Sequence, residues 1–578
     1  MNRQSLKTEV SIKFAILSET ISLKPWELGC LEQILQIDNL QLAFVLITKS
    51  RLKIKKERFL KSIFKYGMIK MLYYFLGKFC VGRSFLKRKD LLGLLSKTPI
   101  IYCIPNKDQK SADTFEKADL ETIKNAELDF IMAFSGFGNL SEDIFKLAKY
   151  GIWSLFIGIE KYDFRSLPAF WECYEGQNSI ELSLVKLSPG SPSSLILKSG
   201  IIPIFTSSYF KTINEINVQA ARWVKAGCFN GVIESNNCIE RPISGEFLDG
   251  RRNPNSLEVI AFFSRWLGQK IMKYIKNLFF CDQWTIGYID RPVNELLRNV
   301  KDYRINWLLF PQRKEFFADP FPIRRNDNLF IFFEKYNYKL RKGKIAFIEV
   351  GKRPKIKDVC LSARHSDHLS FPYVFEDKDE FFMVVEQWKT EEIILYRPKN
   401  FPSEWEKVAT LIKNVKASDP IIFKFNELWW LFFTTVENNP DLDLFIYYSG
   451  KLSGPWIPHK KNPVKTDISS SRCAGRVFSH GDWLVRPAQN CSKGYGISIV
   501  LNKIIKLSPD DFEEEQVAGI EPNRKNRFNA GIHTFNPIEN FVVVDGKRHI
   551  FALNNFFTKT IKNFWPHSNN QNDTKETD

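Results

Sequence analysis

NDNLFIFFE (326–334) is the first of five strand-like apolar runs that recur at intervals of roughly 50 residues in the second half of the chain. The other runs are KDEFFMVVE (378–386), NELWWLFFT (426–434), HGDWLVRPA (480–488) and ENFVVVDG (539–546). Each follows a short polar or Asp-Pro lead-in and a turn. A period of this length, with several short strands per repeat, is typical of β-propeller blades. The sequence therefore predicts an all-β, five-bladed propeller over residues 282–560.

The lead-ins predict where a ligand site lies, because the first polar side chains of a propeller's innermost strands point into its central channel. The five lead-ins are ADPF (318–321), LSFP (369–372), SDPI (418–421), AGRV (474–477) and GIHT (531–534). From these and nearby residues we expect Asp319 and Asp419 to be the catalytic pair if the protein is an enzyme. We expect ligand contacts from a polar and basic set, which comprises His368, Ser370, Arg476, Arg486 and His533.

Length and charge narrow the class of protein. The chain has 578 residues, which predicts two domains, and a formal net charge of +18, which predicts an anionic partner. Residues 51–90 interleave lysines and arginines with apolar residues, a pattern typical of a basic helix on an anionic membrane surface. The alternative is a helical insertion whose apolar face packs on its own domain. Zinc-finger spacings and RNA-binding signatures are missing, so nucleic acid is not an expected partner.

The cysteines and the start of the chain bear on localisation. The ten cysteines show no CxxC spacing, the first residues lack the apolar core of a signal peptide, and no uncharged run reaches 18 residues. We therefore expect reduced thiols and a cytoplasmic protein that can rest on the inner membrane face through residues 51–90.

Residues 1–235 alternate strand-like runs with helical patterns, which predicts an α/β domain with a Rossmann-type parallel sheet. No G-x-G-x-x-G follows the first predicted strand, so a dinucleotide fingerprint is absent. Residues 236–281 are predicted to be a linker that ends in a basic helix. The polar stretch 561–578 is predicted to be a disordered tail.

The first half also resembles a known family. DFIMAFSGFGNLSEDIFKLAKYGIWSLFIG (129–158), LPAFWE (167–172) and SPGSPSSLILKSGIIPI (188–204) are similar in layout to the folate-dependent formyltransferase domain. The resemblance implies that formyl transfer would need an Asn, a His and an Asp, and their positions fall near Trp153, at 155–157 and at 191–194. None of these residue types occurs there, and all seven histidines lie at or beyond His365. We therefore expect an inactive domain and no cofactor, with folate bound only if the domain were active.

The second half resembles the N-terminal domain of the plant glucosamine inositolphosphorylceramide transferases and related bacterial proteins. The resemblance rests on an ordered set of motifs: DQW (282–284), FADPF (317–321), FE (333–334), KGKI (342–345), HLSFP (368–372), GPW (454–456), NPV (462–464), AGRVF (474–478) and RPAQ (486–489). That family in turn looks like five-bladed glycosidases of the arabinanase and invertase type. The resemblance implies a sugar, sugar-phosphate or glycolipid ligand. The glycosyl-transferring domain of the plant enzymes is a separate module, and nothing in this chain resembles it.

Glycosidase chemistry needs one protonated and one ionised carboxyl group across the scissile bond. Asp319 and Asp419 match two of the three carboxylates that the resemblance implies, and a glutamate from a later blade is hard to find. Glu334 and Glu386 fall at the far ends of strands, where we do not expect a channel position.

Structural roles compete with these assignments. Asp-Pro before a strand is a common turn, so Asp319 and Asp419 have a structural alternative, and Arg476 could form a buried ion pair with either of them. His365 and His368 flank Asp367 but lack further ligands, so no metal site is expected.

The favoured interpretation is a carbohydrate-recognising protein of cell-surface glycan or glycolipid biosynthesis, with its ligand in the propeller channel. Two enzymatic alternatives stay open. One is a propeller glycosidase or glycosyltransferase that uses Asp319 and Asp419, and the other is a formyl or acyl transferase that acts on an amino-sugar.

Overall fold

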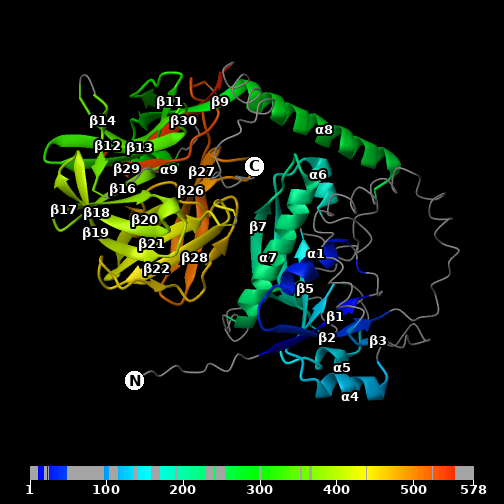
Figure 1. Cartoon of the computed structure of the whole chain (residues 1–578). Helices are drawn as coiled ribbons and strands as arrows, with labels where there is room; N and C mark the ends of the chain where they lie inside the picture. Colours follow the sequence, from blue (N-terminus) through cyan, green and yellow to red (C-terminus); the bar gives the residue numbers. More distant parts are fainter. Residues whose placement is uncertain are drawn as a thin grey trace, which may run out of the picture. The chain divides into compact units, whose positions relative to one another are not determined.

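The computed structural model divides the chain into two compact units, Met1–Leu267 and Gly268–Asp578 (Figure 1). The division falls inside the range 236–281, where the sequence predicts a linker. The predicted basic helix at 51–90 and the predicted tail at 561–578 lie outside the described residues. The structure describes residues 11–18, 23, 25–48, 97–102, 115–134, 140–157, 169–188, 193–229, 239–242, 254–298, 303–351, 355–362, 368–437, 439–523 and 525–552.

The first unit is built on one eight-stranded sheet with the order β3-β2-β1-β4-β5-β6-β7-β8. Its strands are β1 (Ile12–Ser18), β2 (Leu40–Ile47), β3 (Ile100–Tyr102), β4 (Phe130–Ala133), β5 (Ile152–Ile157), β6 (Ser179–Lys186), β7 (Ser193–Pro203) and β8 (Ile239–Pro242). Its helices are α1 (Pro25–Ile34), α4 (Lys117–Asn125), α5 (Glu142–Phe145), α6 (Phe170–Glu175) and α7 (Tyr209–Phe229).

The predicted parallel sheet is confirmed for β1 to β5, whose pairs all run parallel. In β1, Phe14, Ala15, Ile16 and Leu17 are all fully buried, as expected for a parallel strand covered on both faces. The remaining strands differ from the prediction, because β5-β6, β6-β7 and β7-β8 are antiparallel. The short connection between β6 and β7 explains part of this difference, since a hairpin can join only antiparallel strands.

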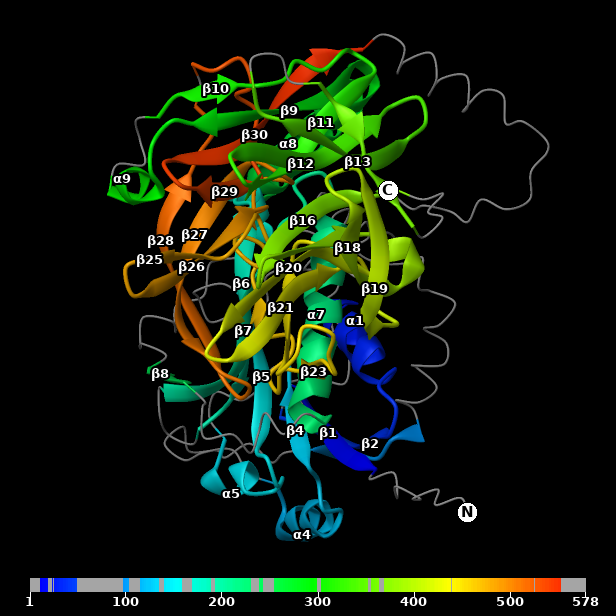
Figure 2. The same cartoon turned by 90° about the vertical axis from the view of Figure 1, so that its left-hand side faces the viewer.

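Helix α8 (Ser256–Phe279) leads into the second unit, which is a five-bladed propeller (Figures 1 and 2). The predicted number of blades is therefore confirmed. Blade one is β11 (Glu315–Arg325), β12 (Asn328–Asn337), β13 (Lys342–Glu349) and β14 (Lys357–Asp358). Blade two is β16 (Ser370–Asp377), β17 (Glu380–Glu386), β18 (Glu392–Asn400), β19 (Glu404–Lys413) and β15 (Cys360–Leu361).

Blade three is β20 (Ala417–Phe425), β21 (Leu428–Thr435), β22 (Asp443–Ser449), β23 (Ile457–Pro458) and β24 (Lys465–Thr466). Blade four is β25 (Phe478–His480), β26 (Trp483–Asn490), β27 (Ser498–Leu507) and β28 (Phe512–Ile520). Blade five combines the two ends of the unit: β29 (Phe535–Ile538) and β30 (Phe541–Phe551) pair with β9 (Phe280–Ile289) and β10 (Ile305–Trp307), and the short helix α9 (Val293–Arg298) lies between β9 and β10 in the chain.

Pairing of β9 with β30 closes the propeller. The two strands run antiparallel in continuous register from Phe280 opposite Phe551 to Ile289 opposite Val542. Strands from the beginning and the end of the unit therefore share one sheet, which removes two open edges. Among the described residues, no helix is both long and apolar enough to cross a membrane.

Candidate functional site

The innermost strands of blades one, two and three share one irregular feature. Their register with the second strand shifts after Ala318, Ser370 and Ser418, so each carries a bulge at its start. The following residues, Asp319, Phe371 and Asp419, have left-handed φ values of 53°, 48° and 48°. Non-glycine residues rarely adopt this conformation, and such outliers concentrate at functional sites. Asp319 and Asp419 thus occupy equivalent positions, and their counterpart in blade two is Phe371 rather than the predicted ligand contact Ser370.

The second strands of blades one and two bring two more carboxyl groups to the same end of the propeller. Glu334 lies opposite Ala318, and Glu386 lies opposite Ser370. The prediction that these glutamates avoid the channel is therefore wrong. An antiparallel second strand runs back along the first, so its last residues lie beside the first residues of the innermost strand.

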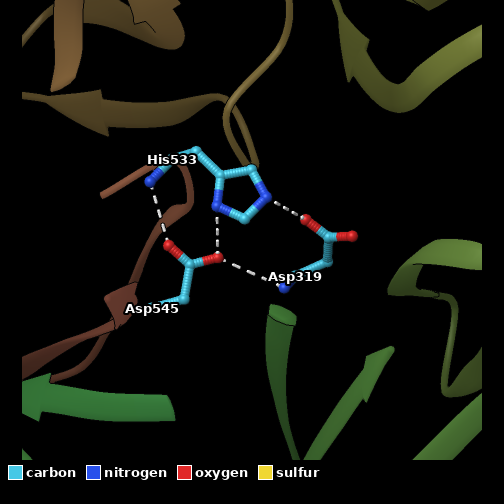
Figure 3. A group of neighbouring side chains, drawn as sticks. All are labelled: Asp319, His533 and Asp545. Atoms are coloured by element: carbon cyan, nitrogen blue, oxygen red, sulfur yellow. Dashed lines mark hydrogen bonds and ion pairs between the residues drawn. The ribbon is translucent and has the colours of Figure 1, made fainter. Parts of the chain in front are cut away.

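His533 connects blade five to blade one through two carboxylates (Figure 3). Its Nε2 lies 3.0 Å from Oδ1 of Asp319, and its Nδ1 lies 2.8 Å from Oδ2 of Asp545 on β30. The backbone N–H groups of His533 and Thr534 donate to Oδ1 of Asp545, and the backbone N–H of Asp319 donates to its Oδ2. These three residues link the last blade to the first. Sequence reasoning predicted Asp319 and His533 as site residues but not Asp545.

The charge of the His533 ring follows from this geometry. Burial alone would lower the pKa of His533, but the carboxylates of Asp545 and Asp319 outweigh it and raise the pKa to about 10. Among the described residues, these three side chains also form a group whose possible metal-ligand atoms lie within 4.8 Å of one another. A metal ion needs a ring nitrogen without its proton, whereas a carboxylate beside each nitrogen favours a proton on both. The arrangement fits an imidazolium better than a metal ligand.

Asp419 forms its ion pair with Arg472, whose Nε lies 2.6 Å from Oδ2 of Asp419. The sequence offered an ion pair of Arg476 with Asp319 or Asp419 only as the structural alternative to ligand binding. Arg472 also donates to Oδ1 of Asp441 at 2.8 Å. Gln489 on β26 donates to the same Asp419 oxygen at 2.8 Å. The carboxyl group of Asp419 is thus held by two neighbours, both of which sequence reasoning missed.

Glu386 is ionised by the groups around it. Its Oε2 accepts hydrogen bonds from the Ser418 hydroxyl at 2.6 Å and from the Asp419 backbone N–H at 2.9 Å. Burial would raise the pKa of Glu386, but the charge of Arg472 and these hydrogen bonds together lower it below its ordinary value.

The pKa of Glu334 is shifted in the opposite direction. Burial, together with the negative charges of Asp319 and Glu386, raises the pKa of Glu334 well above its ordinary value. Its Oε1 lies 3.6 Å from Nε2 of His368, too far for a hydrogen bond, and it has no hydrogen-bond donor within the part of the chain that the structure describes. The backbone N–H of Gly343 donates to Nδ1 of His368, so a neutral His368 ring directs its Nε2–H toward Glu334.

Two predicted ligand-binding arginines have structural partners. Arg476 donates to the carbonyls of Pro322 and Val374 at 2.8 and 3.2 Å, which ties the blade-four lead-in to the innermost strands of blades one and two. The lead-ins therefore converge on one axis. Arg486 is fully buried and contacts Glu514 twice, at 2.8 and 2.5 Å, and it also donates to the backbone carbonyls of Ser470 and Ser471. The ligand-binding role predicted for Arg486 has no support in these contacts.

In the first unit, the residue at the predicted formyltransferase Asn position is part of the core. Trp153 is buried, its ring stacks on Phe130 at 4.4 Å, and its Nε1 donates to the carbonyl of Tyr150. Residues 191–192 of the predicted Asp position lie outside the described residues. A formyltransferase-like domain therefore stays a prediction.

The comparisons with known proteins concern the propeller. Residues 310–536 match the family model described as glucosamine inositolphosphorylceramide transferase 1, N-terminal. Enzymes named glucosamine inositolphosphorylceramide transferase 1 from Oryza sativa subsp. japonica and Arabidopsis thaliana are 37% and 32% identical over 223 and 219 residues. The aligned regions cover 37% of this chain and only 29% and 28% of those enzymes. The predicted similarity to this family is thereby confirmed for the propeller, and the chain spans less than a third of the relatives' length.

Solved structures give weaker likenesses. A family 117 glycoside hydrolase of Zobellia galactanivorans superposes with a TM-score of 0.32 at 12% identity, over 48% of this chain and 92% of that chain. An α-L-arabinofuranosidase of Clostridium thermocellum gives a TM-score of 0.27 at 10% identity, over 38% of this chain and 81% of that chain. Scores this low carry no argument, and the five-bladed assignment rests on the strand pairing.

The His533 ion pairs predict a specific pH dependence of stability. Because the folded-state pKa of about 10 exceeds the ordinary value of 6.5, the stabilisation is complete below pH 6.5 and is lost as the pH rises toward 10. We expect His533→Asn to lower the free energy of unfolding at pH 7 by about 3–5 kcal/mol, since it leaves buried carboxylates unpaired. Denaturant unfolding at pH 6, 7, 8, 9 and 10 measures both effects.

The matched control is His480→Asn, because His480 is a less buried histidine that contacts Asn294 at the edge of the propeller. We expect this variant to follow the wild-type pH curve. A His533→Asn variant whose stability falls with pH as steeply as the wild type would contradict the assignment.

Proposed function

We propose that the acidic end of the propeller channel binds a carbohydrate, and that this carbohydrate carries a free amino group. The proposal rests on an excess of buried carboxyl groups over the cations that contact them. The cations are Arg472 and His533, and the five carboxyl groups are Asp319, Glu334, Glu386, Asp419 and Asp545. Buried negative charge is unfavourable until it is paired, so an ammonium group would be stabilised here.

Glu334 is the observation that carries the proposal. It is only 5% exposed, and its Oε1, which lies 3.6 Å from Nε2 of His368, has no hydrogen-bond donor among the described residues. An ammonium or hydroxyl group of a ligand would supply the missing donor. Binding of an ammonium would also favour the ionised form of Glu334 and lower its raised pKa.

Two residues at the edge of the acidic cluster remain open to solvent. The side chain of His368 is 29% exposed, and Tyr495 is 43% exposed. The Tyr495 ring lies 5.3 Å from the His533 ring and under the guanidinium of Arg472, at 4.8 Å. An aromatic face beside hydrogen-bonding groups suits a sugar, which has both an apolar face and hydroxyl groups.

The relatives support the same ligand class. The matching enzymes are named for the transfer of glucosamine to inositolphosphorylceramide, and the match covers the channel residues from Asp319 to His533. We extend this to a role in the synthesis or modification of a cell-surface glycan or glycolipid, with a sugar, sugar-phosphate or glycolipid as ligand. A cytoplasmic location stays a prediction.

Catalysis is the second candidate, and one observation favours it. The pKa of Glu334 is raised and that of Glu386 is lowered, so Glu334 retains a proton to a higher pH than Glu386 does. Opposite shifts of this kind assign a general acid and a carboxylate base or nucleophile in glycoside chemistry. In this candidate, Glu334 is the acid and Glu386 is the ionised carboxylate. Burial and the charges of Glu386 and Asp319 also raise the pKa of Asp419 well above its ordinary value, although the ion pair with Arg472 opposes that shift.

For the first unit we propose an inactive formyltransferase-like domain. Its support is chemical: the first 364 residues contain no histidine, and Trp153 fills the core where the resemblance implies a catalytic Asn. Folate would bind only if the domain used another base.

Isothermal titration with glucosamine and N-acetylglucosamine tests the proposed ligand. We expect the full chain to bind glucosamine at least about tenfold more tightly, because acetylation removes the charge that the carboxyl cluster requires. Glu334→Gln should weaken glucosamine binding by about tenfold, whereas Glu427→Gln, in a 94% exposed side chain, should leave it unchanged. Equal affinity for both sugars would show that the amino group is not recognised. A lack of affinity for any sugar would contradict the proposed carbohydrate ligand.

Release of nitrophenol from nitrophenyl glycosides tests the catalytic candidate. We expect a bell-shaped pH profile and a loss of roughly 100-fold or more in kcat for both Glu334→Gln and Glu386→Gln. Glu427→Gln serves again as the control. If the protein binds sugar but nitrophenol is released no faster than in buffer alone, catalysis is excluded and the function is carbohydrate recognition.

Thermal melts with folate test the first unit. We expect no shift in Tm at about millimolar folate, because a ligand stabilises only the folded state that it binds. A concentration-dependent rise in Tm would show an intact folate site and overturn the proposal of an inactive domain.

A further inference from the structure

Helix α8 changes its environment along its length. In its first half, Val259 and Phe262 are buried, and the Phe262 ring packs against Phe170 at 5.0 Å and Tyr209 at 5.8 Å. These contacts anchor the beginning of the helix in the first unit. From Gly268 to Phe279 the helix belongs to the second unit, and it is largely exposed. The helix therefore has more apolar surface than its own contacts cover.

The exposed apolar side chains of α8 lie on one face. With about 100° between successive residues, Ile260, Leu267, Ile271 and Tyr274 fall within one stripe, and Leu257 and Ile275 border it. Their exposed fractions are large for apolar residues: Leu257 77%, Ile260 43%, Leu267 52%, Ile271 49%, Tyr274 62% and Ile275 40%. We call this stripe the α8 apolar face. An exposed apolar surface of this extent marks an interaction site.

The charges beside the C-terminal half of this face have one sign. Residues 268–279 contain Lys270, Lys273 and Lys276 and no acidic residue, whereas Glu258 lies in the first turn of the helix. Lys276 also contacts Nε2 of His549 at 3.0 Å. On the helical wheel, Lys270 borders the apolar face on the side of Tyr274. Lys276 lies on the other side, beyond Met272, and Lys273 lies between these two lysines on the polar side. Lysines at such borders can extend their chains over apolar surface and hold the ammonium group at a charged boundary.

Aromatic residues continue the apolar surface beyond the end of the helix. Phe279 stacks on Phe551 of β30 at 6.1 Å, and Phe280 contacts the same ring at 5.8 Å. Phe280 and Phe551 are 39% and 55% exposed. Aromatic side chains at one end of an amphipathic helix are typical of helices that lie in the membrane interface.

We infer that α8 docks on an anionic phospholipid membrane, with its apolar face toward the acyl chains and its three C-terminal lysines among the headgroups. The C-terminal half of this face, from Gly268 to Phe279, is bordered by cations without acids, which fits this partner better than a second protein surface. The helix would lie along the surface, since no described helix is suited to span a bilayer. This inference is independent of the proposed sugar ligand.

Vesicle co-sedimentation of the full chain tests the docking. The probes are phosphatidylcholine vesicles with and without phosphatidylglycerol, at low and high salt. We expect binding only with phosphatidylglycerol, and weaker binding at high salt. Lys270→Gln/Lys273→Gln/Lys276→Gln should reduce binding on the order of 100-fold, from about fivefold per lysine. Leu267→Ser/Ile271→Ser should reduce it by more than tenfold.

Matched controls separate α8 from general charge and hydrophobicity. Lys357→Gln/Lys378→Gln/Lys525→Gln removes three exposed propeller lysines, and Leu340→Ser removes a 65% exposed leucine. Both should bind vesicles like the wild type, with an unchanged circular dichroism melt in all variants.

Three results would overturn the inference. One is vesicle binding by the α8 variants that equals the wild type. Another is self-association in sedimentation velocity that Leu267→Ser/Ile271→Ser abolishes, which would make a second copy of the chain the partner. The third is strong hydrogen-exchange protection along Gly268–Phe279 without vesicles that Leu267→Ser/Ile271→Ser removes, which would show that the chain covers this face itself.

Discussion

A protonated imidazole between two buried carboxylates is the interaction on which the rest of the propeller site depends. His533 belongs to the last blade and Asp319 to the first, so their ion pair joins blade five to blade one, whereas the pairing of β9 with β30 completes blade five itself. Asp545 holds the other ring nitrogen and also accepts from the backbone of both lead-ins. Closure of the ring and placement of the site are therefore achieved by the same few atoms.

Buried carboxyl groups cannot all be ionised unless they are paired, and the propeller provides partners for some of them but not for all. Asp319 and Asp419 each have a cation, and Glu386 has Ser418 and the nearby Arg472. Glu334 has none of these partners, and burial together with the neighbouring carboxylates raises its pKa well above the ordinary value; burial also raises the pKa of Asp419, in spite of its ion pair with Arg472. A buried carboxylate oxygen without a hydrogen-bond donor among the described residues marks a position where a ligand would be recognised.

Much of the site could be predicted from residue types, but their pairing could not. The repeated lead-ins identified Asp319, Asp419 and His533, because side chains at one position of a repeat meet around its axis. Sequence reasoning missed Glu334 and Glu386, although each closes an apolar run in the sequence (FFE and VVE), a signal that becomes useful once the antiparallel return of the second strand is considered.

By itself, the sequence determined the five repeats, their limits and the parallel half of the first sheet, since these depend on periodic patterns that are local along the chain. Only the tertiary structure decided that Arg472 rather than Arg476 pairs with Asp419, and that the pKa of Glu334 is raised. Arg472 and Arg476 lie four residues apart in one loop, so no local pattern distinguishes them. Ion pairing and pKa depend on burial and on charges from several blades, which come together only when the chain folds.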